Sequence, residues 1–190
     1  MDYFKLAELI KKTPYGEFDF PLLMDVLQRY KKPRNIITRL LKNKDIIRVK
    51  KGLYIYGEDS LGPPYQKEVL ANLIYGPSYI SLEFALSYYG LIPERVETVT
   101  SMTNKKNKVF DTPVGTFSYR YIANRYFMLG VNRIDIDENR YVLMASKEKA
   151  IIDLLYQQKQ TMTYEETFTF LMDDLRINRD ELTQLNSQRV

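Results

Sequence analysis

Residues 31–56, KKPRNIITRLLKNKDIIRVKKGLYIY, combine the pattern of a short basic helix with that of a tight β-hairpin. Within residues 33–43 the apolar side chains recur at the spacing of one helical face, and they are Ile36, Ile37, Leu40 and Leu41. Pro33 suits the first turn of a helix, where a missing N–H costs no hydrogen bond. The sequence therefore predicts a helix over residues 33–43 with one apolar and one polar face.

A β-hairpin is predicted directly after this helix. Residues 47–50, IRVK, alternate apolar with basic side chains, as a half-buried strand does. Gly52 supplies the left-handed residue that a tight turn needs, and residues 53–56 form the return strand. We expect Tyr54 and Tyr56 to pack within the sheet, and stacking on nucleic-acid bases is the alternative. A helix followed by a hairpin, both with basic outer faces, is typical of a winged helix-turn-helix.

The charge of the chain is concentrated in this stretch. Residues 31–51 hold nine basic side chains and one acid, a net charge of +8, whereas the whole chain carries +4. Such a concentration is expected of a phosphate-binding face, and a solvated lysine-rich helix is the alternative. The predicted DNA contacts are Lys31, Lys32, Arg34, Asn35, Thr38, Arg39, Lys42, Arg48, Lys50 and Lys51. Of these, Arg34, Asn35, Thr38 and Arg39 occupy the first part of the helix, which usually reaches base edges.

The predicted fold class is α+β, with an N-terminal winged helix-turn-helix over residues 1–57. Two further helices complete that domain, one over residues 3–12 and one from an N-cap at Asp19 to residue 30. Residues 58–64 are rich in turn formers and are predicted to be a linker. Residues 65–190 are predicted to form a mixed α/β domain with a mainly antiparallel sheet.

The second domain should begin with a helix over residues 65–75, and Ser81 should cap the next one. Strands are predicted over residues 96–102, 108–112, 116–122, 126–129 and 141–145. Ser146 and Thr163 are predicted N-caps of two later helices, and Asn178 marks the start of a last one. We expect Tyr79, Tyr88 and Tyr89 to pack this domain, with a partner-facing aromatic patch as the alternative.

The composition excludes several classes of protein. No apolar run is long enough for a membrane span, and the N-terminus lacks the apolar core of a signal peptide, so we expect a cytoplasmic protein. The chain has no cysteine and no histidine, which removes disulfides, thiolate metal sites and the commonest general base.

No motif of an enzyme is recognisable in the sequence. It lacks Gly-rich phosphate-binding motifs, and the Glu-x-Lys or Asp-x-Lys pattern of restriction-type nucleases does not occur. Residues 135–138, DIDE, could bind a hard cation, but a solvated turn explains them better. We therefore expect no catalytic residues, no metal and no cofactor.

The order of these motifs resembles the AbiEi family, the antitoxin and transcriptional-repressor half of AbiE (type IV) abortive-infection toxin–antitoxin systems. Each motif alone is weak, but they follow one another in the right order over about two thirds of the chain. They are residues 51–54 (KGLY), 79–81 (YIS), 85–86 (AL), 90–91 (GL), Ala145, 148–150 (EKA) and 153–154 (DL).

The resemblance implies an N-terminal winged helix that binds inverted repeats in its own promoter. It also implies a C-terminal domain that counteracts a nucleotidyltransferase-like toxin without requiring a stable complex. Because palindromic sites are read by two protein copies, a homodimer or cooperative monomers on adjacent half-sites are expected. The predicted function is therefore that of an autoregulating DNA-binding repressor and antitoxin in phage defence.

Two alternatives remain open at this point. In one, the protein is an interaction module that binds a partner protein through the C-terminal domain. In the other, it is a winged-helix regulator that binds RNA.

Overall fold

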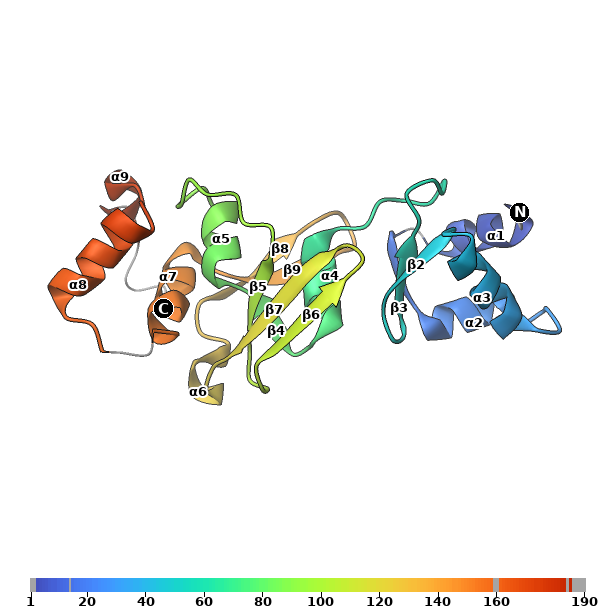
Figure 1. The fold of residues 1–190 in the computed structure, drawn as a ribbon, viewed down its shortest axis with the longest axis horizontal. Coiled ribbons are helices and arrows are strands. Elements are labelled where there is room, and N and C mark those ends of the chain that lie inside the picture. The colour runs from blue at the N-terminus through green and yellow to red at the C-terminus, as the bar shows by residue number, and fades with distance from the viewer. Residues whose placement is uncertain (1–2, 14, 159–160, 184, 186–190) are drawn as a thin grey trace. The chain divides into compact units, whose positions relative to one another are not determined.

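The computed structural model describes residues 3–13, 15–158, 161–183 and 185 (Figure 1). The described chain is a mixture of helices and two sheets, so the fold class is α+β. It divides into two compact units, residues 1–74 with 112–114 and residues 75–111 with 115–190. No helix within the described ranges combines the length and the apolar character needed to cross a membrane.

The first unit contains four helices and a three-stranded sheet among its described residues. Its elements are α1 (Tyr3–Lys12), β1 (Glu17–Asp19), α2 (Phe20–Leu27), α3 (Pro33–Lys42), β2 (Ile46–Lys50), β3 (Leu53–Tyr56) and α4 (Lys67–Ile74). As predicted, Asp19 caps α2, and its carboxylate accepts a hydrogen bond from the Leu22 N–H at 2.9 Å. The helices over residues 3–12 and 33–43 and the hairpin over residues 47–56 also form close to their predicted bounds.

The strand β1 was not predicted, and it explains why β3 is buried on both sides. The sheet order is β1-β3-β2, with both pairings antiparallel, so β3 lies in the middle. All four residues of β3 are buried. A strand of three residues is too short for its alternation to be recognised in the sequence, so only pairing with β3 identifies it.

The apolar faces of α2 and α3 meet in one core. Its buried members are Leu9, Phe18, Leu23, Val26, Leu27, Ile36, Ile37, Leu40, Ile46, Tyr54 and Tyr56. In β2 the buried side chains are those of Ile46 and Val49, whereas Ile47 is only partly buried. The pairing of β2 with β3 shifts between Arg48 and Lys50, so the simple alternation predicted for this strand is wrong. Such a bulge places an extra residue in one strand and changes which side chains point inward.

The first unit also extends beyond the end predicted for the first domain. The prediction placed the domain over residues 1–57 and the linker over residues 58–64, but the unit includes α4. Three hydrogen bonds join the region of α4 to earlier elements. The Lys50 ammonium donates to the carbonyl oxygens of Leu73 and Ile74, and the Gln66 N–H donates to the Glu17 carboxylate. These contacts join residues that are separated by 23 to 49 positions in the sequence, and a local sequence pattern does not reveal them.

The second unit is built on a six-stranded sheet of order β6-β7-β5-β4-β9-β8. Its strands are β4 (Ser78–Ile80), β5 (Val99–Thr103), β6 (Lys108–Thr112), β7 (Gly115–Tyr121), β8 (Val131–Asp135) and β9 (Tyr141–Ala145). The pairs β4–β5 and β8–β9 are antiparallel, and the pairs β4–β9 and β5–β7 are parallel. The sheet is therefore mixed, with two parallel pairs besides the antiparallel pairs that the sequence predicts.

The helices of the second unit follow the predicted caps in most cases. They are α5 (Leu82–Tyr88), α6 (Asn124–Phe127), α7 (Lys147–Tyr156), α8 (Tyr164–Thr169), a π-helical turn (Phe170–Asp174) and α9 (Arg179–Thr183). The side chains of Ser146 and Thr163 accept hydrogen bonds at the starts of α7 and α8. Residues 126–129 do not form the predicted strand, because residues 124–127 turn into α6 before β8 begins.

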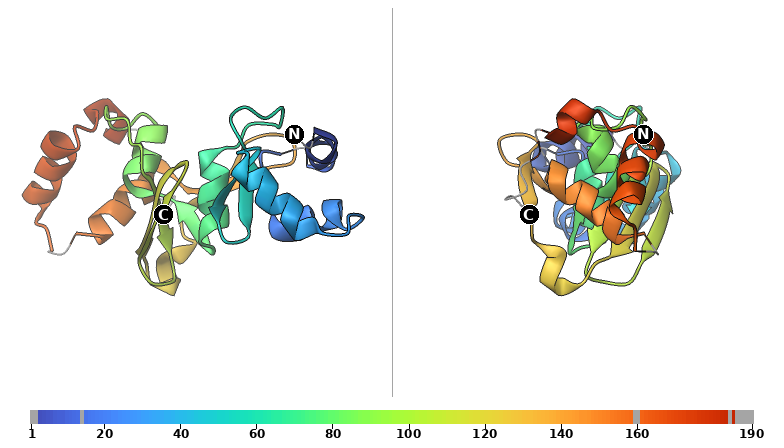
Figure 2. Two further views of the ribbon diagram at one scale, coloured as in Figure 1. Left: turned by 45° about the vertical axis from the view of Figure 1, so that its right-hand side comes forward. Right: turned by 90° about the vertical axis from the view of Figure 1, so that its left-hand side faces the viewer.

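In the second unit the helices α5 and α7 pack against each other, and α5 also packs on the strand β5 (Figure 2). The sheet carries large side chains with no more than 1% exposure, among them Tyr79, Met102, Phe117, Tyr119 and Met144. These side chains fix the strands that carry the polar residues discussed below.

Candidate nucleic-acid interface

The helix α3 is held by its apolar face. Ile36, Ile37 and Leu40 are buried, and they share one core cluster with Leu23 and Val26 of α2. Pro33 occupies the first turn, as the sequence predicts. Because one face of α3 is fixed in this way, the opposite face is directed to solvent.

The end of α3 is joined tightly to the hairpin. The Asp45 N–H donates to the Leu40 carbonyl at 2.9 Å, and Lys44 adopts a left-handed conformation with φ of 60°. The carbonyl of Asp45 in turn accepts from the Gly57 N–H at 3.0 Å, just after β3. The hairpin is therefore positioned relative to α3 by backbone hydrogen bonds rather than by flexible side chains.

Nine of the ten predicted DNA contacts lie on exposed positions of these elements. They are Lys31, Lys32, Arg34, Asn35, Thr38, Arg39 and Lys42 before and along α3, with Arg48 and Lys51 on the hairpin. Within residues 31–51 the single acid, Asp45, is only 7% exposed. The exposed side chains of residues 31–51 are therefore basic or neutral, and this stretch contributes no exposed carboxylate.

Thr38 has a restricted hydrogen-bonding role. Its hydroxyl donates to the carbonyl of Arg34, one turn earlier in α3, at 3.0 Å. The hydroxyl hydrogen is thereby used within the helix, so Thr38 has only lone pairs and a methyl group to offer an incoming ligand.

A hollow of about 450 Å³ lies beside the start of α3. It is lined by Tyr30, Lys31, Lys32, Asn35, Ile36 and Arg39. Three of these side chains are cationic and none is acidic, which is the chemistry that accommodates a phosphate group.

Lys50 is the exception among the predicted contacts. Its ammonium donates to the carbonyl oxygens of Leu73 at 3.0 Å and Ile74, at the C-terminal end of α4. A cation at this position satisfies carbonyls that have no partner within the helix and interacts favourably with its dipole. The prediction that Lys50 contacts phosphate is therefore corrected, because its side chain is committed to α4. The bulge at Val49 brings this change about, since it alters the direction of the strand at Lys50.

The tyrosines of β3 belong to the core, which confirms their predicted packing role. Tyr54 and Tyr56 are 6% and 5% exposed, and the Phe18 ring lies 6.3 Å and 4.8 Å from their centroids. The hydroxyls of Tyr56 and Thr13 are hydrogen-bonded, and burial raises the pKa of Tyr56. Stacking of these rings on nucleic-acid bases is thus excluded by their burial.

The tyrosines predicted to pack the second unit behave differently from one another. Tyr79 is fully buried, whereas Tyr88 is 48% exposed. Tyr89 is partly buried, donates its hydroxyl to the Ala145 carbonyl at 2.9 Å and contacts the edge of the Tyr88 ring. The packing role is confirmed for Tyr79 and Tyr89 and only in part for Tyr88.

Residues that carry the resemblance in the second half of the chain meet in one buried polar cluster. Lys149 and Asp153, one turn apart on α7, form an ion pair at 2.8 Å and are 2% and 0% exposed. The hydroxyls of Tyr79 and Ser81 donate to the other Asp153 oxygen at 2.9 Å and 2.7 Å. We call Tyr79, Ser81, Lys149 and Asp153 the buried polar cluster.

Burial dominates the electrostatics of this cluster. It raises the pKa of Asp153, and the hydrogen bonds and charge of Lys149, Ser81 and Tyr79 oppose that shift. The pKa of Tyr79 is raised far above its usual range by burial and by the neighbouring Asp153 carboxylate. The sequence alone does not place these four residues together, although a charged pair four residues apart beside Ala150 and Leu154 is an available signal.

The acidic residues 135–138 lie at the connection between β8 and β9. The Asp137 carboxylate accepts hydrogen bonds from the backbone N–H groups of Asn139 and Arg140 and from the Arg140 side chain. These bonds lower the pKa of Asp137 and confirm that it closes a turn. In the described part of the chain, no group of three or more histidine, cysteine or acidic side chains could hold a metal ion.

A comparison with protein-family models found no match for this chain, and a comparison with curated proteins found none that is similar.

Proposed function

We propose that residues 1–57 form a winged helix-turn-helix that binds double-stranded DNA, with α3 in the major groove and the β2–β3 hairpin against the backbone. The observation that carries this proposal is the exposed outer face of α3, which presents Arg34, Asn35, Arg39 and Lys42, while the single acid of residues 31–51 is buried. An α-helix fits the major groove, and a rigid hairpin beside it provides a second contact with the duplex.

The side chains divide into two groups by their position. Arg34, Asn35 and Arg39 are the candidates for base contacts, since arginine pairs with guanine and asparagine with adenine. Thr38 joins them only as an acceptor or through its methyl group. Five other residues are assigned to phosphates, which orient the protein without specifying sequence: Lys31, Lys32, Lys42, Arg48 and Lys51.

We further propose that the protein acts as a transcriptional repressor of its own operon and as the antitoxin of an AbiE-like system. The support for this step is the resemblance described above, together with the fact that Tyr79, Ser81, Lys149 and Asp153 from its separate motifs come together in space. The second unit would then carry the antitoxin activity. Its action would depend on binding rather than on catalysis, as expected for a chain without histidine or cysteine.

A band-shift with the intergenic DNA upstream of the gene, at two salt concentrations, tests the DNA-binding step. The full chain should shift this duplex at low salt, and the shift should weaken at high salt because bound counterions are released on binding. Arg34→Ala/Arg39→Ala should weaken binding by about 2 kcal/mol or more, since each base contact contributes about 1–3 kcal/mol.

The matched control is Arg95→Ala/Arg133→Ala, which removes the same charge from exposed positions of the second unit. If the wild-type chain fails to shift the fragment at low salt, or if both double variants lose binding equally, the proposal is overturned. A tighter complex with an RNA hairpin than with the duplex at equal salt would instead establish the RNA-binding alternative.

A further inference from the structure

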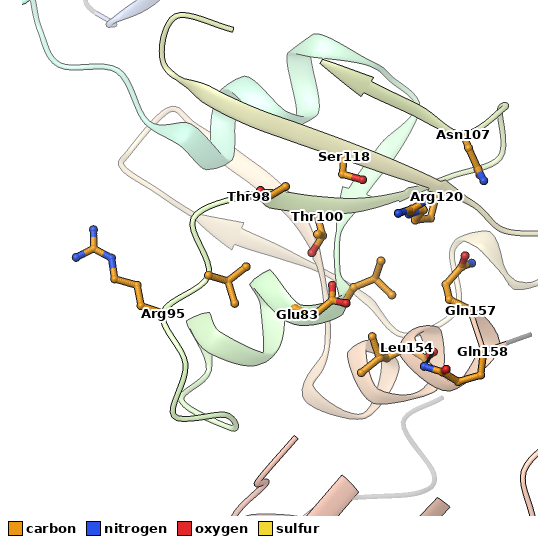
Figure 3. Close-up of a pocket in the computed structure, with 12 residues that line it drawn as sticks. Glu83, Arg95, Thr98, Thr100, Asn107, Ser118, Arg120, Leu154, Gln157 and Gln158 are labelled. Carbon is orange, nitrogen blue, oxygen red and sulfur yellow. Dashed lines mark hydrogen bonds between the residues drawn. The ribbon is translucent and has the colours of Figure 1, made fainter. Parts of the chain in front are cut away.

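A pocket of about 880 Å³ lies in the second unit between the strands β5 and β7 and the helices α5 and α7 (Figure 3). This volume falls in the range of pockets that enclose small organic ligands. Leu82, Val96 and Leu154 contribute apolar surface, and the other side chains that line the pocket are polar or charged. The pocket is separate from α3 and the hairpin, and the proposed DNA contacts do not use it.

Three charged side chains line this pocket, and one of them, Arg95, pairs with Glu97. Arg120 comes from β7 and Glu83 from the first turn of α5. Among the described residues, neither side chain has an ion-pair or hydrogen-bond partner. A guanidinium offers parallel N–H donors that match a phosphate group, and a carboxylate accepts from the two adjacent hydroxyls of a ribose.

Two amide side chains in the pocket are oriented by the backbone of one residue. The Tyr121 N–H donates to the Asn107 side-chain oxygen at 2.7 Å, and the Tyr121 carbonyl accepts from the Gln157 amide nitrogen at 2.9 Å. These bonds determine which end of each amide is used. Asn107 therefore presents its NH₂ group as a donor, and Gln157 presents its oxygen as an acceptor. A neighbouring donor and acceptor match the hydrogen-bonding edge of a nucleobase.

The backbone beside the pocket is strained. Leu82 adopts a left-handed conformation with φ of 58°, although it is a buried, non-glycine residue. The Ser81 side chain does not cap α5 and instead donates to Asp153 of the buried polar cluster. The N–H of Phe84 is satisfied by the Thr100 hydroxyl at 3.1 Å. In proteins, residues that the surrounding structure holds in an unfavourable backbone conformation occur most often at ligand and active sites.

The surface next to the pocket continues the same chemistry. A second hollow of about 790 Å³ shares Asn107 with the pocket and is lined also by Tyr75, Asn104, Lys105, Lys106 and Tyr121. Tyr121 is 49% exposed, and Lys106 is exposed. An exposed aromatic ring beside lysines is able to stack a base and neutralise a further phosphate.

We propose that the pocket binds a ribonucleotide. Arg120 binds its phosphate, Glu83 binds the ribose hydroxyls, and Asn107 with Gln157 binds the edge of the base. The ligand is either a free nucleotide or one unit of a single-stranded RNA, in which case the adjacent hollow holds the next unit. This site is independent of the proposed DNA-binding function, so either proposal can fail without the other.

Isothermal titration calorimetry with the full chain tests this site. The probes are ATP, GTP, CTP and UTP, their 2′-deoxy forms, RNA trinucleotides, ribose 5-phosphate and inorganic phosphate. At least one ribonucleotide should bind more tightly than ribose 5-phosphate and phosphate. Arg120→Ala should weaken that binding by about tenfold or more, because a charge-assisted hydrogen bond is lost.

Glu83→Gln should remove the preference for ribose over deoxyribose while leaving phosphate binding in place. The control is Arg133→Ala, an exposed arginine of β8 that pairs with Asp135 and does not line the pocket. Its affinity should equal that of the wild type. Unchanged thermal melting of each variant shows that a loss of binding is not a loss of folding.

The two sources of the ligand are distinguished by Lys106→Ala. This change should weaken binding of the trinucleotide alone if RNA is the ligand, and it should leave a mononucleotide unaffected. If no nucleotide or trinucleotide binds, or if inorganic phosphate binds as tightly as the best nucleotide, the proposal is overturned. Equal affinity for ribose and deoxyribose forms would overturn the role of Glu83.

Discussion

At the scale of single residues, the ion pair between Lys149 and Asp153 is the most demanding feature of the molecule. Both side chains are almost completely removed from solvent. Removing charges from water is costly, and that cost is offset only when each charge is paired and its remaining hydrogen-bonding positions are satisfied. Tyr79, Ser81 and the Tyr126 carbonyl provide those partners. The cluster therefore depends on all of its members being present.

Asp153→Ala should destabilise the protein by about 3–5 kcal/mol, because it leaves the Lys149 ammonium buried without a counter-ion. Replacement of both partners, in Lys149→Met/Asp153→Leu, should cost less than the single change. The measurement is urea unfolding followed by circular dichroism. Asp135→Ala is the control, since Asp135 pairs with Arg133 at the surface and should contribute no more than about 1 kcal/mol. A single variant as stable as the double variant would contradict this account.

At the scale of secondary-structure elements, the hairpin β2–β3 uses its two neighbouring lysines in different ways. Lys50 is bound to the last carbonyls of α4, whereas Lys51 is exposed in the turn. A single-residue bulge separates these roles. The hairpin thus carries a proposed DNA contact, Lys51, next to a residue that binds the helix α4, Lys50.

The pair Lys50→Met and Lys51→Met tests this division. Lys51→Met should weaken DNA binding and reduce the salt slope by about 1, as expected when one phosphate contact is lost. Lys50→Met should leave the slope unchanged and lower the melting temperature, because the end of α4 loses its cap. The measurements are band-shifts over a salt series and thermal unfolding. Identical effects of both substitutions on the slope would show that Lys50 also contacts DNA.

Two glycines of the same region should respond differently to alanine. Gly52 in the hairpin turn has φ of +89° and open space around it, so Gly52→Ala should cost only about 1–2 kcal/mol of backbone strain. At Gly57 a Cβ would overlap the backbone carbonyl of Lys44, so α3 and the hairpin would have to separate. Gly57→Ala should therefore destabilise more than Gly52→Ala and also weaken DNA binding. Thermal unfolding with a parallel band-shift measures both effects, and the reverse order would contradict them.

At the scale of the whole molecule, the uneven charge distribution bears on the proposed association with DNA. Residues 31–51 carry +8, and the remainder of the chain carries −4. A polyanion such as DNA attracts the basic segment of residues 31–51. The net negative charge of the remaining residues disfavours contacts of DNA with other parts of the chain.

The salt dependence of promoter binding follows from the residues assigned to phosphates. With five such contacts per protein copy, the slope of log K against log salt concentration should be about −4.5. Two copies on a palindrome should double that value. Fluorescence anisotropy over a salt series measures the slope, and Arg95→Ala should leave it unchanged. A slope near zero would exclude an interface based on phosphates.

Local sequence patterns were sufficient for the elements that depend on their own residues. The helix α3, the cap at Asp19, the turn at Gly52 and the capping box at Thr163 lie where the sequence predicts them. In each case the decisive interaction joins residues within four positions of one another. Such interactions are specified by side-chain type and spacing alone.

The tertiary structure decided what depends on partners distant in the chain. The strand β1 exists because β3 offers an edge, Lys50 turns to α4 because of a bulge, and the sheet is mixed because β4 pairs with β9 and β5 with β7. The buried polar cluster and the pocket beside it join residues more than 70 positions apart in the sequence. The spacing of residues along one strand or helix does not determine which distant segment packs beside it. The sheet order, the buried polar cluster and the pocket all depend on which distant segments come together.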